Sequence, residues 1–290
     1  MAAALEVSHL TKRYWDFTLD DFSLTIPECG VTGIIGPSGA GKTTLMNLIM
    51  NLASPDAGEI VVFGLPLSEH EKEIKNRIGY VGEDPLFDAN RTVSWTGHFV
   101  AGFFESWNGS RFRSLLEEFG VASHKKVKDL SRGRTTLLGV AIALSHEADL
   151  YLLDEPTAGL DLVARRRVLE LLSGLAEDEG KTVILSSHNT EGVAEIADRV
   201  VFINEGRLIL HEEREDLMGR WKWIHYRDGA LADDILTTLS RRERRPFSCK
   251  GLTANYPALC DRLADSIAAG DVRVENVDLG EILISMIEGN

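Results

Sequence analysis

The stretch Gly36-Pro37-Ser38-Gly39-Ala40-Gly41-Lys42-Thr43-Thr44 decides the fold of this chain. It matches the phosphate-binding pattern G-x-x-x-x-G-K-S/T. The apolar run Val31-Thr32-Gly33-Ile34-Ile35 precedes it and predicts a buried strand. From Thr44 to Met50, apolar residues recur at helical spacing. A strand, a glycine-rich loop and the start of a helix are the context that such a loop needs.

The residue types in this loop suit a triphosphate. Glycines let the backbone curl so that successive N–H groups point at one anion. The N-terminus of the following helix adds partial positive charge. We expect Lys42 to reach the β- and γ-phosphates and Thr43 to offer its hydroxyl to Mg²⁺. The loop therefore predicts binding of a nucleoside triphosphate.

Composition narrows the class of protein further. The chain has 290 residues, 44% of them hydrophobic and 26% charged, which suits a large globular domain with or without a small annex. Its net charge of −14 argues against a general nucleic-acid binder. Cys29, Cys249 and Cys260 lack metal-ligand spacing, which favours reduced thiols in a cytosolic protein. No apolar run reaches the ~20 residues that span a bilayer, so we expect another chain to do any spanning.

Two aromatic features have alternative interpretations. Tyr14 lies between the expected strands 5–7 and 17–19, where it either stacks on a base or packs within the β-layer. Residues 93–128 show a helical pattern that includes Trp95, Phe99, Phe103 and Phe104. We expect most of these aromatic residues to be core, and docking of a partner is the alternative.

Polar residues follow several of the expected strands. Glu83 follows strand 78–82, where it either meets Mg²⁺ or water near the loop or lies in a solvated turn. Asp154 and Glu155 end the apolar run Leu150-Tyr151-Leu152-Leu153. Carboxylates at the end of a buried strand predict a ligand crevice, with Asp154 holding Mg²⁺ and Glu155 serving as general base. His188 ends a further strand, 182–187, and is expected to converge on the same crevice. Ser131 and Gly133 begin a second helix, where they act as an ordinary cap or as a second anion site.

In their order along the chain, these motifs resemble the ATP-binding cassette (ABC) ATPases over roughly residues 5–218. The segment Leu130-Ser131-Arg132-Gly133 is the discriminating part of the resemblance, and Gly159-Leu160-Asp161 adds to it. In detail, the sequence is most similar to the ATPases of bacterial drug, antibiotic-peptide or lipid exporters.

The resemblance implies an α/β fold: a P-loop NTPase (RecA-like) core, an N-terminal antiparallel β-subdomain and a helical subdomain at about 84–145. It assigns residues 1–218 to the nucleotide-binding domain and 219–290 to a small C-terminal α+β accessory domain. In that second part we expect strands at 221–226 and 272–274 and helices at 258–269 and 279–287. The run Arg241–Arg245 is expected to be a solvated charge run, with a basic patch as the alternative.

The resemblance also implies the role of each site residue. Tyr14 stacks on adenine, residues 36–44 are Walker A, and Glu83 stands where the family usually has Gln near Mg²⁺. Ser131 and Gly133 belong to the signature and Asp161 to the D-loop. Asp154 is the Walker B acid, Glu155 the base and His188 the γ-phosphate sensor.

The implied function is ATP hydrolysis that drives a separate polytopic membrane permease, on the cytoplasmic side of the inner or plasma membrane. Two cassettes, identical or different, pair so that each ATP lies between Walker A of one and the signature of the other. The signature here is Leu130-Ser131-Arg132-Gly133-Arg134 instead of the common Leu-Ser-Gly-Gly-Gln. The alternatives are a soluble non-transport ABC ATPase and a nucleotide-binding regulatory module with little turnover. No nucleic-acid partner is expected.

Overall fold

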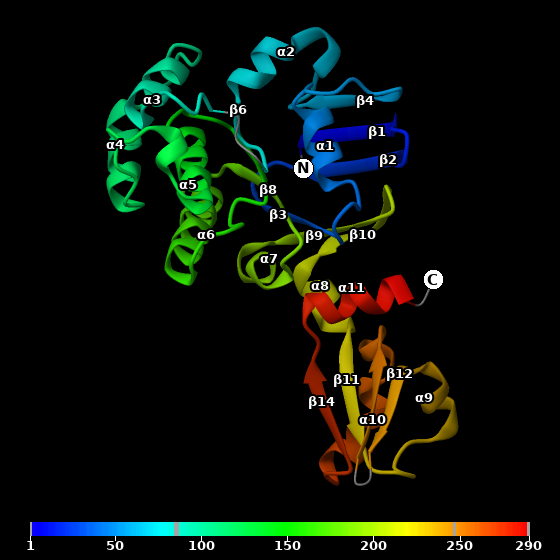
Figure 1. Cartoon of the computed structure of the whole chain (residues 1–290). Helices are drawn as coiled ribbons and strands as arrows, with labels where there is room; N and C mark the ends of the chain where they lie inside the picture. The colour runs from blue at the N-terminus through cyan, green and yellow to red at the C-terminus, as the bar shows by residue number, and fades with distance from the viewer. Residues whose placement is uncertain (1, 84–86, 246–247, 289–290) are drawn as a thin grey trace. The chain divides into compact units, whose positions relative to one another are not determined.

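The computed structural model describes residues 2–83, 87–245 and 248–288. It divides into two compact units, Met1–His211 and Glu212–Asn290 (Figure 1). The sequence-based boundary after residue 218 falls inside α8 (Arg214–Arg220), the first helix of the second unit.

A six-stranded sheet forms the centre of the first unit, in the order β10-β9-β3-β8-β7-β6. The strands are β3 (Gly30–Ile35), β6 (Ile78–Val81), β7 (Leu150–Asp154), β8 (Thr182–Ser187), β9 (Arg199–Asn204) and β10 (Arg207–Glu213). β6, β7, β8, β3 and β9 pair in parallel, so their carboxyl ends meet at one edge. Every residue of β7 and β8 is buried, as the continuous apolar runs predicted. The predicted α/β core is confirmed.

A second sheet, in the order β2-β1-β4-β5, forms the predicted antiparallel subdomain. It contains β1 (Ala3–Arg13), β2 (Thr18–Pro27), β4 (Ala57–Val62) and β5 (Leu65–Pro66). The strand expected at 17–19 is the beginning of a longer strand, β2, whose burial alternates around Phe22. Leucines of β1 pack with apolar residues of α1 (Lys42–Ile49) and β7 in one hydrophobic core. This core holds α1, and with it the loop that precedes α1, between the two sheets.

The helices of the first unit begin at polar caps. Thr92, Asn108, Ser131 and Asp161 accept backbone N–H bonds at the starts of four of them. Figure 1 shows α3, α4 and α5 grouped on the opposite side of the first unit from the β1–β2–β4 sheet. Residues 84–86, where the predicted helical subdomain begins, lie outside the described residues. The helices are α2 (Leu67–Asn76), α3 (Val93–Ala101), α4 (Gly109–Glu118), α5 (Arg132–Ala143), α6 (Leu162–Glu177) and α7 (Thr190–Ile196), with a 3₁₀ turn at Val127–Asp129.

The prediction that most aromatic residues of the helical region are core is wrong for three of them. Phe112 on α4 is buried. Trp95, Phe99 and Phe103 are 39%, 53% and 64% exposed, and they form what we call the α3 aromatic ladder. The rings of Trp95 and Phe99 stack with their centroids 5.0 Å apart, and the ring of Phe103 meets that of Phe99 edge to face at 5.2 Å. Four residues separate each from the next, so Trp95 and Phe99 share the solvent side of α3, and Phe103 continues the row in the turn after the helix.

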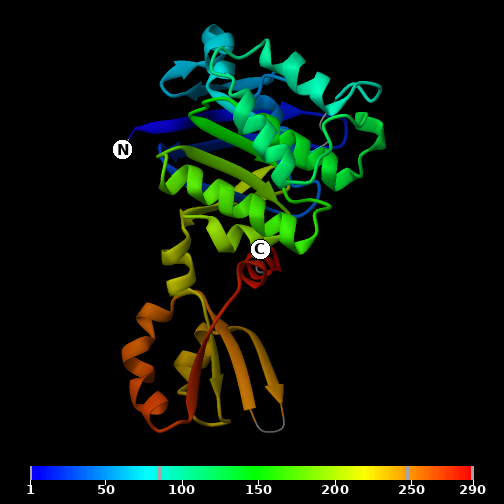
Figure 2. The same cartoon turned by 90° about the vertical axis from the view of Figure 1, so that its left-hand side faces the viewer.

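The second unit is a small α+β domain. Its antiparallel sheet runs β12-β13-β11-β14, and Figure 2 shows α10 beside β14. Ile224, Leu252 and Leu263 are fully buried within it. The charge run 241–245 is an edge strand, with residues 241–244 exposed. The elements are β11 (Lys222–Tyr226), α9 (Asp233–Thr238), β12 (Ser240–Arg245), β13 (Ser248–Thr253), α10 (Cys260–Ala268), β14 (Val272–Asn276) and α11 (Leu279–Glu288), with a 3₁₀ turn at Tyr256–Ala258.

Within the described residues, no helix has both the length and the apolar character needed to cross a membrane. The longest helix of this part, α6, has 16 residues, whereas a crossing needs about 20.

Candidate functional site

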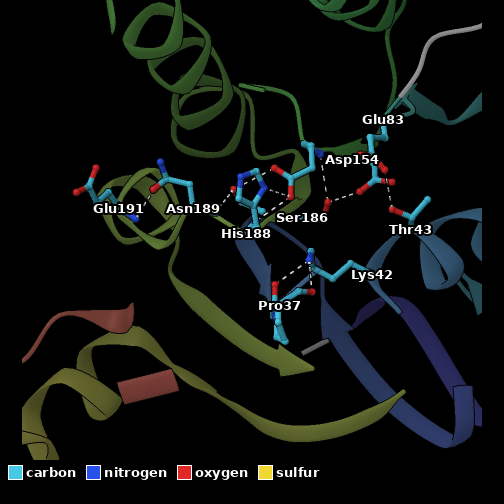
Figure 3. A network of polar contacts seen from close by, with 12 residues as sticks. Pro37, Lys42, Thr43, Glu83, Asp154, Ser186, His188, Asn189 and Glu191 are labelled. Carbon is cyan, nitrogen blue, oxygen red and sulfur yellow. Dashed lines mark hydrogen bonds and ion pairs between the residues drawn. The ribbon is translucent and has the colours of Figure 1, made fainter. Parts of the chain in front are cut away.

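The loop of residues 36–41 joins β3 to α1, and its conformation requires glycine at Gly41. Gly41 has a φ of 108°, and a Cβ atom there would lie 2.7 Å from the ring of Phe17. Lys42, the first residue of α1, is buried and donates from Nζ to the carbonyls of Gly36 at 2.8 Å and Pro37 at 3.0 Å (Figure 3). Burial lowers the pKa of Lys42, and the charges of Glu155, Asp154 and Glu83 oppose this shift.

A cavity of about 1150 Å³ opens over this loop, large enough for a nucleoside triphosphate. It brings together most of the sequence-predicted site residues, from the segment after β1, the loop, the start of α1 and the ends of β6, β7 and β8. Those that line it are Tyr14, Ser38, Gly39, Gly41, Lys42, Thr43, Thr44, Glu83, Glu155 and His188. Gly36, Pro37 and Ala40 belong to the loop but do not line the cavity.

Asp154 ends β7 beneath the cavity and is buried. Its Oδ1 accepts a hydrogen bond from Ser186 on β8 (Figure 3). Its Oδ2 is also buried and accepts no hydrogen bond from the described residues. Burial raises the pKa of Asp154, with the Ser186 hydroxyl acting against that shift. A buried carboxylate oxygen without a partner is a fit position for a divalent cation.

Thr43 and Glu83 complete the predicted magnesium set. Thr43 Oγ1 donates to Glu83 Oε2 at 3.4 Å (Figure 3). Hydroxyl and carboxylate oxygens, together with Asp154, are the hard ligands that Mg²⁺ prefers. These three residue types therefore fit the ion.

Glu155 and His188 are in direct contact. Glu155 leaves β7 with a φ of 51° and is largely buried. Its Oε1 accepts from the backbone N of His188 at 2.7 Å and lies 2.8 Å from His188 Nδ1. With the Nδ1 proton directed at the carboxylate, Nε2 of His188 is left for other contacts.

Ser131, Gly133 and Asp161 do not line the cavity, although their neighbours Arg132, Gly159 and Leu160 do. Ser131 caps α5 by accepting from Arg134 N at 3.4 Å, and Asp161 caps α6 by accepting from Ala164 N at 2.9 Å. A Cβ atom on Gly133 would lie 2.6 Å from the carbonyl of Gly159, so the signature segment packs against the turn before Asp161. In a single chain Ser131 and Asp161 are helix caps, and Gly133 is a close packing position in the first turn of α5.

Sequence reasoning missed Ser186, Ser187, Phe17 and Arg165. Arg165 is the first of three consecutive arginines near the start of α6, and their side chains point in different directions because successive helical residues diverge by 100°. Arg165 lines the cavity, and its Nη2 donates to Asn189 Oδ1 at 3.4 Å. The serines had a usable signal, because they end a strand that was already expected beside the two acids.

Comparison with known proteins gives consistent matches. The family model described as ABC transporter matches residues 19–158. The bacitracin transport ATP-binding protein BcrA of Enterococcus faecalis is 31% identical over 242 residues, which cover 81% of this chain and 79% of that protein. The Nod factor export ATP-binding protein I of Burkholderia orbicola (strain AU 1054) is 35% identical, over 71% of this chain and 70% of that protein.

Solved structures match as well. A dimeric ATP-binding cassette, determined in a post-hydrolysis state with ADP and Pi, superposes with a TM-score of 0.66 at 24% identity. The match covers 72% of this chain and 98% of that one. At this identity the likeness shows the fold.

Proposed function

This chain belongs to the ABC transporter family as an ATP-binding subunit, and we propose that it hydrolyses ATP with Mg²⁺ to drive a separate membrane exporter. One observation carries the proposal: Lys42, the acids Asp154 and Glu155, and His188 converge at the carboxyl edge of one parallel sheet. Catalytic groups of open α/β sheets lie at this edge.

The triphosphate binds along the loop of residues 36–44, where backbone N–H groups and the start of α1 stabilise its charge. Lys42 exchanges the carbonyls of Gly36 and Pro37 for the β- and γ-phosphates. Tyr14 is 45% exposed at the cavity rim and stacks on the adenine. Thr43, Glu83 and Asp154 would hold Mg²⁺, which when bound neutralises charge on the β- and γ-phosphates.

Glu155 acts as the general base that takes a proton from the attacking water. Such a group contributes about 10²–10⁴-fold to a rate. Its contacts with His188 keep the carboxylate oriented at the sharp exit from β7. His188 keeps Nδ1 on Glu155 and offers Nε2 to the γ-phosphate, so the base and the sensor act together.

A second cassette, identical or different, completes each site. Ser131, Gly133 and Asp161 lie off the cavity of their own chain and serve the ATP bound by the partner cassette. Leu162 and Val163, directly after Asp161, are 79% and 80% exposed, which supports a surface that another protein covers. The related cassette crystallised with ADP and Pi is itself a dimer.

The membrane subunit docks on the α3 aromatic ladder, at the cytoplasmic face of the membrane. Arg91 lies over the Trp95 ring, with its guanidinium 4.6 Å from the ring centroid, and adds a cation to one end of the ladder. A contiguous apolar strip with a charged rim suits an amphipathic helix of a partner. The exporter assignment rests on the relatives named for bacitracin transport and Nod factor export.

The proposal is tested by affinity purification of the tagged chain from detergent-solubilised membranes, followed by an ATPase assay of the eluate. Co-elution of a polytopic membrane chain that stimulates hydrolysis is the expected result. Recovery of the chain alone or with a soluble protein only, with no stimulated turnover, would contradict the transport assignment.

A further inference from the structure

Each acid at the end of β7 has its own serine on the neighbouring strand. The parallel register of β7 and β8 pairs Asp154 with Ser186, whose hydroxyl donates to Asp154. One residue further, Ser187 Oγ donates to Glu155 Oε2 at 3.3 Å. Both serines are buried, so each hydroxyl depends on protein partners for its hydrogen bonds.

The direction of the Ser187 hydroxyl is fixed from the other side. The backbone N of Asn189 donates to Ser187 Oγ at 3.0 Å. Because the oxygen accepts there, its proton is available for Glu155. Two further hydrogen bonds fix the position of Asn189. Its Oδ1 accepts from the backbone N of Glu191 at 3.0 Å and from Arg165 Nη2 at 3.4 Å.

Ser187 is therefore the residue that orients one half of the Glu155 carboxylate. Oε1 is engaged by His188. Within the described part of the chain, the hydrogen bond that Oε2 accepts comes from Ser187. Without this hydrogen bond, only Oε1 of Glu155 is held, and the carboxylate can rotate about the Cγ–Cδ bond. Rotation changes the direction in which the free lone pair of the carboxylate faces water.

We propose that Ser187 is a positioning residue that sets the Glu155 carboxylate for proton transfer from water. This inference rests on the proposed role of Glu155 as general base. Removing the hydroxyl in Ser187→Ala lowers kcat about 10- to 100-fold, the range for a misplaced catalytic group. The KM for ATP and the ATP dissociation constant change little, because the hydroxyl of Ser187, although Ser187 lines the cavity, is engaged by Glu155 and by the backbone N of Asn189. Ser187→Thr keeps a hydroxyl and restores most of kcat.

Ser173→Ala is the matched control. Ser173 Oγ donates to Glu177 Oε1 at 2.6 Å on α6, so the same substitution removes the same kind of hydrogen bond outside the cavity lining. The experiment measures kcat and KM, ATP binding and the unfolding midpoint for wild type and the three variants. It also measures Ser187→Ala in the Glu155→Gln background, as a double-mutant cycle.

The expected result is a loss of kcat for Ser187→Ala alone, rescue by threonine, and no further loss once Glu155 is Gln. An unchanged kcat in Ser187→Ala, or an equal loss in both backgrounds, would overturn the inference, because Ser187 would then not act through Glu155. Failure of wild type and Ser173→Ala to hydrolyse ATP at all would instead contradict the proposed function.

Discussion

The α3 aromatic ladder gives the most specific prediction about a partner. Phe99 is 53% exposed in its middle. A phenylalanine side chain presents about 200 Å², so about 100 Å² becomes covered when a partner docks on this ring. At about 25 cal/mol per Å², loss of this contact costs about 2.5 kcal/mol, or roughly 70-fold in affinity. Phe99→Gln removes the ring and keeps a residue that favours helix.

The assay titrates the purified chain onto inside-out membrane vesicles stripped of peripheral proteins. The account predicts that Phe99→Gln needs roughly 70-fold more protein for half-saturation than wild type. The unfolding midpoint falls as well, because Phe99 loses its ring contacts with Trp95 and Phe103, each worth about 0.5–1.5 kcal/mol. Leu52→Gln is the control, since Leu52 is a 60% exposed apolar residue after α1. Equal binding of Phe99→Gln and wild type, or an equal loss in Leu52→Gln, would refute the reasoning.

Further predictions concern the fold and the metal. Gly206 has a φ of 75°, and a Cβ atom there would lie 1.9 Å from the carbonyl oxygen of Thr18. Gly206→Ala should therefore lower the free energy of unfolding by more than the ~1–2 kcal/mol that left-handed backbone strain alone costs. Gly64→Ala, at the same φ with open space, shows the strain alone in the same urea titrations, and equal losses would contradict the clash. Burial lowers the pKa of His146, so its stabilising contribution is complete above about pH 6.5 and is lost as the pH falls toward the folded-state pKa. Urea midpoints between pH 5 and 7.5 should depend less on pH in His146→Gln, and an unchanged slope would contradict this. Glu83→Gln removes a carboxylate from the magnesium set and should raise the Mg²⁺ concentration for half-maximal turnover about 3- to 10-fold, which a Mg²⁺ titration of the ATPase rate checks. An unchanged requirement would remove Glu83 from the set.

Local features of the fold were predictable because their causes are contiguous in the sequence. The strand before residue 36, the loop and α1 follow from apolar runs and glycines that lie side by side. The Ser131 cap of α5 and the acidic end of β7 follow from the same kind of short-range chemistry.

The features that sequence reasoning missed depend on tertiary context. The arginine-rich strand β12 lacks the apolar alternation of a buried strand, and its pairing with β13 stabilises it at an edge. The ladder residues have helical spacing that fits a buried face and an exposed face equally well. Which face is buried depends on the packing of α3 against α5 and of Gly97 against Phe112 on α4.

The site itself was predicted as a set of residues but not as a set of contacts. That Asp154 and His188 follow buried strands predicts a common edge. The contact of Glu155 with His188 requires that β7 and β8 be neighbours in register. The sequence places Ser187 at the end of an expected strand, but its contact with Glu155 could not be predicted for the same reason, since that contact depends on the register of β7 and β8.

The central claim is tested most directly by measuring ATP binding and ATP hydrolysis on wild type and Glu155→Gln in parallel. The account predicts that the variant binds ATP with an affinity close to that of wild type while kcat falls about 10²–10⁴-fold. Equal hydrolysis by both proteins would show that Glu155 is not the base. Loss of ATP binding in the variant would show that the residue serves the nucleotide site and not the chemical step.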